Sequence, residues 1–579
     1  SSSGGFGGGG GGRIALYAAD STAFNLANLT ALGGTGGTPG GAGTVYLRDT
    51  DEAQGTLLID GSGGGNGWTA LGLAGTNLTV MADVVVVRGA NTHVQPVSST
   101  NVLEFLTNVT VSSGAQLTLV ASNTVFHAPL VVAGGARVDV TGALSPTIPV
   151  VVTNNAVLTV AGALNLTVPL TLDSGARVEV TGPLTSSVPL PLAGGVTWQV
   201  NGPLTSSVPV TVSGSTLSVD YLAAPQLVLA NGALLNCLAS TASQMHKLEV
   251  NVAGTITVSA DSRIDVSGLG YLPGRTSGNT ATGASTGRSG GSHAGLGGNS
   301  MGAANAAYGD YADPDDWGSG GGNTYGGDGT SGGGLVRLAA GALQLDGQLL
   351  ADGSSNTAGT GSGGGVLVVV NTLAGGGSIR ANGGSSSGGF GGGGGGRIAL
   401  YAGDWNGFNL TNVTALGGTG GTPGGAGTVL MLQSVPHTHA RFSVPGELRV
   451  FPTNNYTFPL PRAFSNSLSI HFNRPMATNS FTPDKFLIQG PVGAVVPTGI
   501  TEVGDRLYRI TFPPQTEQGT YHFTLLPTLL DAEGYQLDQN ANGIPGESGD
   551  AFTFTLVLDS VPPRVTQHAP AGDIAGTIT

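Results

Sequence analysis

A segment near the end of the chain has the spacing of a calcium-binding loop. Oxygen-bearing side chains occupy the first, third and fifth positions from Asp538, and Gly543 occupies the sixth, where a tight loop bends sharply. The twelfth position is Gly549 rather than Glu, so a bidentate carboxylate would have to come from a neighbouring position. The expected ligands are Asp538, Asn540, Asn542, the Ile544 carbonyl, Glu547 and Asp550. The alternative is a solvated turn rich in Asp and Asn.

A second candidate site is a dense cluster of acidic and aromatic residues in the middle of the chain. Its members are Tyr308, Asp310, Asp313, Asp315, Asp316 and Trp317. Carboxylates beside exposed rings can bind calcium or the face of a sugar, and two acids at a suitable separation can cleave a glycosidic bond. The alternative, which we favour, is a long solvated loop whose rings pack against the flank of the domain.

Two further features have simpler interpretations. His437 and His439 could share a metal ion on a strand, but no further ligand is evident and a linker is preferred. Cys237 is the single cysteine, so a disulfide framework within the chain is excluded, and we expect a small buried apolar residue.

The composition favours an extracellular β-protein. The 102 Gly and 31 Pro make up about 23% of 579 residues, close to the level of low-complexity chains, yet 39% of the residues are apolar. A net charge of −14, with only 9% charged residues, argues against binding to nucleic acid. Gly lacks the spacing of collagen, and no apolar run reaches the roughly 18 residues of a membrane-spanning helix.

A 20-residue repeat extends from about residue 109 to 225. Proline opens the copies at Pro129, Pro149, Pro169, Pro189 and Pro209. Alternating apolar columns predict short strands with one buried face. These columns are Val138, Leu158, Val178 and Trp198; Val140, Val160, Val180 and Val200; and Leu144, Leu164, Leu184 and Leu204. A unit this short must stack on its neighbours, about 4.8 Å apart, which predicts a parallel β-helix. Glycines at Gly142, Gly162, Gly182 and Gly202 are expected to provide corners with positive φ.

The glycine-rich region has a second period. Gly334, Gly365, Gly396 and Gly427 are 31 residues apart, and each precedes an apolar segment that reads as a strand. This spacing predicts that the glycine runs are long turns between short strands, with mobile tips, rather than a linker.

Polysaccharide lyases and hydrolases also use β-helix folds, so an enzyme has to be considered. The outward columns hold mainly Thr, Ser, Val and Ala, with isolated Arg137, Asp139, Arg177 and Glu179. Residues of like charge stand two coils apart, or about 10 Å, so we expect weak surface ion pairs and no catalytic centre.

The first 20 residues recur almost unchanged from Ser385, at an offset of 384. We therefore expect Ser1 to lie inside a structural unit and the chain to be a fragment of a longer modular protein. The expected divisions are 1–50 and 261–440, both glycine-rich coils; 51–260, the 20-residue coils; 441–558, a β-sandwich; and 559–579, the start of another module.

The segment after residue 440 resembles the bacterial Ig-like domains of S-layer and other large secreted proteins. The resemblance rests on SIHFNRPMATNSFTPDKF, YRITFPPQTEQGTYHFTLLP and GYQLDQNANGIPGESGDAFTF. It implies an Ig-like sandwich that acts as a spacer, and it supports calcium in the Asp538 loop. The phrases GGGGGGRIALY and SIRANGG are similar to those of very large surface proteins of environmental bacteria.

Together these features predict an all-β protein: a parallel β-helix with coils of about 20 and 31 residues, followed by an Ig-like sandwich. We expect an extracellular, non-catalytic rod or fibre component of a bacterial surface, with self-association into a fibre or layer. The alternative is a β-helix that binds or cleaves polysaccharide through the 308–317 cluster.

Overall fold

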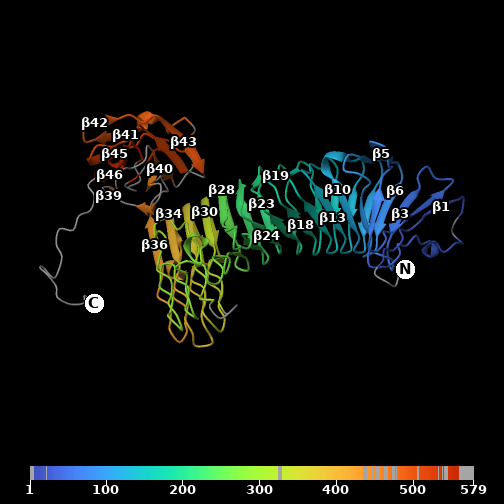
Figure 1. Ribbon diagram of the computed structural model, residues 1–579, viewed down its shortest axis with the longest axis horizontal. Coiled ribbons are helices and arrows are strands. Elements are labelled where there is room, and N and C mark those ends of the chain that lie inside the picture. Colours follow the sequence, from blue (N-terminus) through green and yellow to red (C-terminus); the bar gives the residue numbers. More distant parts are fainter. Residues whose placement is uncertain are drawn as a thin grey trace, which may run out of the picture. The chain divides into compact units, whose positions relative to one another are not determined.

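The strands of the first part of the chain stack along one axis (Figure 1), and they pair in parallel except where Val45 pairs antiparallel with Leu58. The computed structural model divides into two compact units, residues 1–433 and 434–579. It describes all residues except 1–5, 21–22, 324–328, 434–439, 445–446, 452–456, 462–466, 473–475, 478, 505–506, 533, 538, 540–544 and 560–579.

Within the described residues, the first unit has four sheets. Sheet I contains β1 (Arg13–Ala18), β2 (Thr44–Asp49), β3 (Thr56–Asp60), β6 (Val84–Arg88), β9 (Val109–Ser112), β12 (Leu130–Val132), β14 (Val150–Val152) and β17 (Thr171–Leu172). Sheet II contains β4 (Trp68–Leu71), β7 (His93–Pro96), β10 (Gln116–Val120), β13 (Arg137–Thr141), β15 (Val157–Val160), β18 (Arg177–Val180), β21 (Thr197–Val200), β24 (Thr216–Val219), β27 (Leu234–Asn236), β29 (Arg263–Asp265), β31 (Gln348–Leu350), β33 (Ser378–Arg380) and β35 (Val413–Thr414). Sheet III contains β5 (Leu78–Met81), β8 (Val102–Phe105) and β11 (Thr124–Phe126). Sheet IV contains β16 (Leu164–Leu166), β19 (Leu184–Ser186), β22 (Leu204–Ser206), β25 (Tyr221–Ala224), β28 (Leu248–Val258), β30 (Leu335–Leu345), β32 (Gly365–Gly375), β34 (Arg397–Phe408) and β36 (Thr428–Gln433), with a branch of β20 (Leu192–Ala193), β23 (Val210–Ser213) and β26 (Leu227–Ala230).

The 20-residue repeat forms the coils of a parallel β-helix, as predicted. The column Val138, Leu158, Val178 and Trp198 pairs residue by residue across β13, β15, β18 and β21, and all four side chains are fully buried. Pairing in register keeps each apolar column inside, since a slip of one residue would turn every side chain to the other face. One apolar core therefore continues from coil to coil.

The glycine column has a different role from the predicted one. Of the four glycines in this column, only Gly142 has a positive φ, of 91°. The others allow close approach: a Cβ on Gly182 would lie 2.6 Å from the carbonyl carbon of Gly162. The left-handed corners lie earlier in each copy, for example at Asn154 and Gly175.

The glycine-rich coils also differ in detail from the prediction. Their first strands are long, and β28 spans two positions of the coil because it pairs with β25 through its first half and with β26 through its second. Leu335 pairs with Gly365, Gly365 with Arg397, and Arg397 with Thr428. The steps are thus 30, 32 and 31 residues, which agrees with the predicted coils of about 31 residues.

The glycine runs form a hydrogen-bonded bundle, which we call the glycine bundle (residues 270–323, 329–334, 351–364, 381–396 and 415–427). Six successive amides in Gly391–Gly396 donate to three neighbouring segments, each of which is reached at every third residue. The bonds run from Gly391 to Arg288 and Gly394 to Gly291, from Gly392 to Thr422 and Gly395 to Gly425, and from Gly393 to Gly384 and Gly396 to Ala381, at 2.8–3.1 Å. A period of three residues is that of the polyproline II helix, which has no internal hydrogen bonds and leaves its amides to neighbours.

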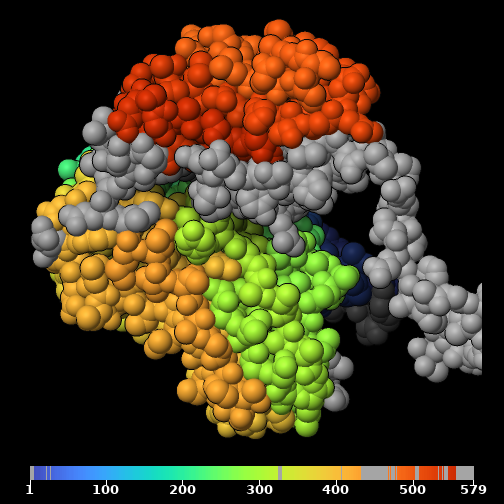
Figure 2. All heavy atoms as spheres, turned by 90° about the vertical axis from the view of Figure 1, so that its left-hand side faces the viewer, coloured from blue at the N-terminus to red at the C-terminus, as the bar shows by residue number. Residues whose placement is uncertain are grey.

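Packing in the glycine bundle excludes side chains. Gly361–Gly364 and Gly391–Gly396 are buried, and a Cβ on Gly393 would lie 2.0 Å from the carbonyl oxygen of Gly361. Figure 2 shows the yellow-green and orange parts of the bundle lying side by side. The glycine runs connect the strands and are not a linker, as predicted, and they pack closely because glycine lets backbones meet at distances that a methyl group forbids.

The two copies of the repeated sequence have different surroundings. In the second copy, β34 lies between β32 and β36 in sheet IV, and its residues Ile398 and Leu400 are fully buried. In the first copy β1 lies at the edge of sheet I and no residue of it is fully buried. Burial of this sequence is therefore decided by the coils that stack on it.

The second unit consists of two five-stranded sheets within its described residues. One holds β38 (Glu447–Phe451), β37 (Ala440–Val444), β40 (Ser467–Phe472), β44 (Leu507–Thr511) and β43 (Gly499–Gly504); the other holds β39 (Thr457–Pro461), β46 (Phe552–Asp559), β45 (Gly519–Leu525), β41 (Phe486–Gly490) and β42 (Gly493–Val495). Side chains from both sheets, such as Ile470 and Phe523, belong to one buried cluster.

The helices are short. They are the 3-10 turns η1 (Leu26–Asn28), η2 (Ala121–Asn123), η3 (Ser277–Asn279), η4 (Leu410–Asn412), η5 (Pro483–Lys485) and η6 (Ser548–Asp550). No helix in the described part of the chain is long and apolar enough to cross a membrane.

Candidate functional site

The acidic and aromatic segment 308–317 is the part of the glycine bundle that packs against the outer face of β30 and β34. The Tyr401 hydroxyl donates to the Ala312 carbonyl at 2.6 Å. The Arg397 Nε donates to the Tyr308 carbonyl at 2.8 Å. The segment is thus held by two side chains of one strand, β34, which lies some 90 residues further along the chain.

Asp313 forms a buried ion pair with Arg337. The guanidinium Nη2 lies 2.7 Å from Asp313 Oδ1, and each side chain is only 5% exposed. Arg337 Nη1 also donates to the Pro314 carbonyl at 2.9 Å. Removing one partner of such a buried pair strongly destabilises the protein, because the other charge would then stay in the interior without a counter-charge.

Asp316 accepts hydrogen bonds from three groups. The Tyr271 hydroxyl lies 2.6 Å from Oδ1, the Ser277 hydroxyl lies 2.7 Å from Oδ2, and the Trp317 amide lies 2.9 Å from Oδ1. Burial and the Asp316 charge raise the pKa of Tyr271 above its ordinary value. The phenol therefore stays protonated and acts as a donor.

His293 is a fully buried histidine of the glycine bundle. Its ring stacks on Tyr308 with centroids 4.9 Å apart, and Nδ1 lies 3.0 Å from the Gly363 carbonyl. Burial lowers its pKa to about 4, against the opposing effect of Asp316. At neutral pH the ring is uncharged and Nδ1 is the donor.

The six residues selected from the sequence lie in one segment, but no three of their carboxylates are grouped so that they could hold a metal ion. Asp313 and Asp316 are engaged in the contacts above, and Tyr308 donates to the Trp317 carbonyl at 2.6 Å. Asp315 is exposed to solvent.

Sequence reasoning missed the basic partners. Arg337 and Arg397 each stand inside or at the start of an apolar strand, LVRLAA and RIALYA. An arginine in such a strand is a signal for a buried ion pair, because a charge is retained there only with a partner.

The candidate calcium loop is described in part. Asp538, Asn540, Asn542 and Ile544 lie outside the described residues, as do His437 and His439. Asp550 is fully buried, and its carboxylate accepts the Glu547 amide at 3.1 Å in a capping box on η6. In the described part of the chain, no group of three or more His, Cys, Asp or Glu side chains could hold a metal ion.

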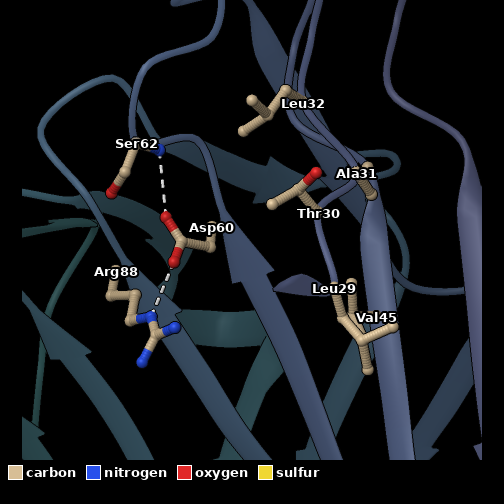
Figure 3. Close-up of a pocket in the computed structure, with 9 residues that line it drawn as sticks. Leu29, Thr30, Ala31, Leu32, Val45, Asp60, Ser62 and Arg88 are labelled. Carbon is tan, nitrogen blue, oxygen red and sulfur yellow. Dashed lines mark hydrogen bonds and ion pairs between the residues drawn. The ribbon is translucent and has the colours of Figure 1, made fainter. Parts of the chain in front are cut away.

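A small pocket lies beside the first glycine segment (Figure 3). Asp60 accepts from the Ser62 amide at 2.9 Å and pairs with Arg88 at 2.7 Å. The apolar side chains of Leu29 and Val45 face this pair across a volume of about 180 Å³. The pocket is below the size of typical small-molecule sites, about 300–1,000 Å³.

The predicted surface pairs are present on sheet II. Arg137 lies 2.7 Å from Asp139, and Arg177 lies 2.6 Å from Glu179. A longer contact of 3.7 Å joins Arg137 to Glu179 across two coils. Each arginine side chain is more than 40% exposed, so these pairs contribute little to stability.

Comparison with known proteins yields no relative. No protein-family model, no curated protein and no solved structure matches the chain. The function of this chain is therefore inferred from the arrangement of its own residues.

Proposed function

We propose that this chain is an extracellular structural or adhesive component of a bacterial surface, without catalytic activity. One observation carries the proposal: a large apolar core runs through the coils of the first unit, and the strands of sheet II form one continuous parallel hydrogen-bond ladder beside it. Thirteen strands of sheet II at about 4.8 Å per step correspond to a shaft of about 58 Å.

The glycine bundle fits a mechanical role. It joins successive coils on one side through backbone hydrogen bonds and places the 308–317 segment against the strands. Only 9% of the residues are charged, which limits repulsion between shafts that associate side by side. In this proposal the shafts assemble into a fibre or layer.

The second unit is proposed as an Ig-like spacer of the S-layer type. Its two sheets share a core rich in aromatic side chains, such as Phe523 and Phe554, whose rings stack 4.7 Å apart. We further propose calcium at the loop from Asp538 to Asp550. Calorimetry of the full chain tests the calcium site, because heat or a melting shift at millimolar calcium is expected and their absence would refute the site.

Immunogold electron microscopy of thin sections through the source cells tests the proposed function. Label on the outer surface, concentrated on fibres or a layer, is expected. Label confined to the cell interior would overturn the proposal.

A further inference from the structure

A polar groove lies on the outer face of sheet II, well apart in sequence from the acidic segment. It is open to solvent and has a volume of about 630 Å³. Hydroxyl and amide side chains provide most of its exposed lining. These are Thr181, Gln199, Asn201, Ser218, Asn236 and Gln244.

The floor of the groove is a ladder of hydrogen-bonding side chains. Gln199 of β21 pairs with Ser218 of β24, and the pairing of β24 with β27 brings Ser218 beside Asn236. Successive coils place these groups about 4.8 Å apart along the axis. The ladder can therefore contact a chain-like ligand at several regularly spaced points.

One wall is a rigid insertion, residues 237–247. Asp220 accepts the Leu238 amide at 3.2 Å and lies 2.5 Å from His246 Nδ1. Asn279 donates to the Thr241 carbonyl at 3.1 Å from outside. These bonds hold the wall before any ligand arrives, which reduces the entropy lost on binding.

The groove has almost no accessible charge. His246 is 9% exposed and is paired with Asp220. Burial raises the pKa of the Cys237 thiol to about 12, so it stays neutral. At the end of the ladder, the half-exposed Arg177 lies 2.6 Å from Glu179 and donates to the Gln199 Oε1 at 3.1 Å, so its charge is paired with a carboxylate beside the groove.

We propose that this groove binds a neutral oligosaccharide chain. Typical small-molecule pockets are lined mainly by apolar and aromatic groups, whereas six of the eleven residues that line this groove carry hydroxyl or amide side chains. An anionic ligand would need cations or helix N-termini. Sugar hydroxyls both donate and accept, as side-chain amides and hydroxyls do, so the lining suits a neutral saccharide. This site does not depend on the proposed shaft function.

Isothermal calorimetry of the full chain tests the site. The probes are hexasaccharides of neutral glucose, mannose, galactose, xylose and N-acetylglucosamine, with a uronic-acid hexasaccharide and an extended polar peptide as competitors. At least one neutral probe is expected to bind with a millimolar or lower Kd. Failure of every neutral probe, or binding of only the acidic sugar or the peptide, would overturn the inference.

Two variants localise the binding. Gln199→Ala with Asn236→Ala is expected to weaken it at least 10-fold, and Ser218→Trp to block it by filling the groove. The matched control, Asn165→Ala, removes an outward amide in a similar ladder on sheet IV, where Asn165 accepts from Thr185 at 2.7 Å. Wild-type affinity in a folded Ser218→Trp variant would place any binding elsewhere and refute the site.

Discussion

A single methyl group added inside the glycine bundle should open it. A Cβ on Gly393 would meet the Gly361 carbonyl oxygen at 2.0 Å and its carbonyl carbon at 2.6 Å. Both are backbone atoms of a buried segment and cannot rotate away, so Gly393→Ala forces the two segments apart. The same sequence also stands in the first copy, where a Cβ on Gly9 would have no neighbour within 4 Å. Gly9→Ala is therefore the matched control.

The size of the effect follows from overpacking and from lost hydrogen bonds. Overpacking costs about 1–3 kcal/mol. Separation also weakens the bonds from Gly393 to Gly384 and from Gly418 to Gly393, worth about 0.5–1.5 kcal/mol each. We expect a loss of local stability of about 3 kcal/mol or more in Gly393→Ala, and a change within about 0.5 kcal/mol in Gly9→Ala.

Native-state proteolysis measures this loss. Thermolysin cleavage at Leu416 reports opening of the second copy, and cleavage at the equivalent Leu32 reports opening of the first. A loss of 3 kcal/mol corresponds to cleavage faster by about 100-fold. Equal cleavage of Gly393→Ala and wild type at Leu416 would refute the packing argument.

Three further predictions concern the core, the ion pair and pH. Trp198→Ala should cost about 3–5 kcal/mol in denaturant unfolding of the first unit, because the side chain is fully buried; a cost below 1 kcal/mol would contradict this. Arg337→Met should cost about 3–5 kcal/mol by leaving Asp313 buried alone, and adding Asp313→Leu should recover at least half of the loss; no recovery would show that the ion pair is not the cause. Burial lowers the pKa of His293 to about 4, below the value of 6.5 in the unfolded chain. The neutral ring therefore contributes on the order of 3 kcal/mol to the free energy of unfolding above pH 6.5, and this contribution is lost as the pH falls toward 4. In His293→Gln the melting temperature should depend less on pH over this range, and an unchanged profile would assign the dependence to other groups.

The repeats of the sequence predicted the β-helix because each column of the repeat is mostly apolar or mostly polar from copy to copy. Buried columns such as that of Trp198 alternate with polar ones, and only stacking can bury them. The sequence did not predict how the glycine runs pack. The Gly391–Gly396 segment has no apolar periodicity, and its threefold pattern exists only in its hydrogen bonds to distant segments.

The acidic segment shows the same limit. Its composition identified it as unusual, and the six residues do lie together. The partners that determine its chemistry, Arg337 and Tyr271, come from the strand after it and the loop before it. No spacing in the segment itself encodes those contacts, because they depend on how 30-residue coils stack.

Hydrogen exchange of the Gly391–Gly396 amides in the full chain tests the central claim most directly. If these glycines form the interior of a hydrogen-bonded bundle, their amides should exchange slowly, with protection like that of the neighbouring strand β34. Exchange at the rate of an unstructured glycine peptide would show that the runs are linkers and would contradict the account.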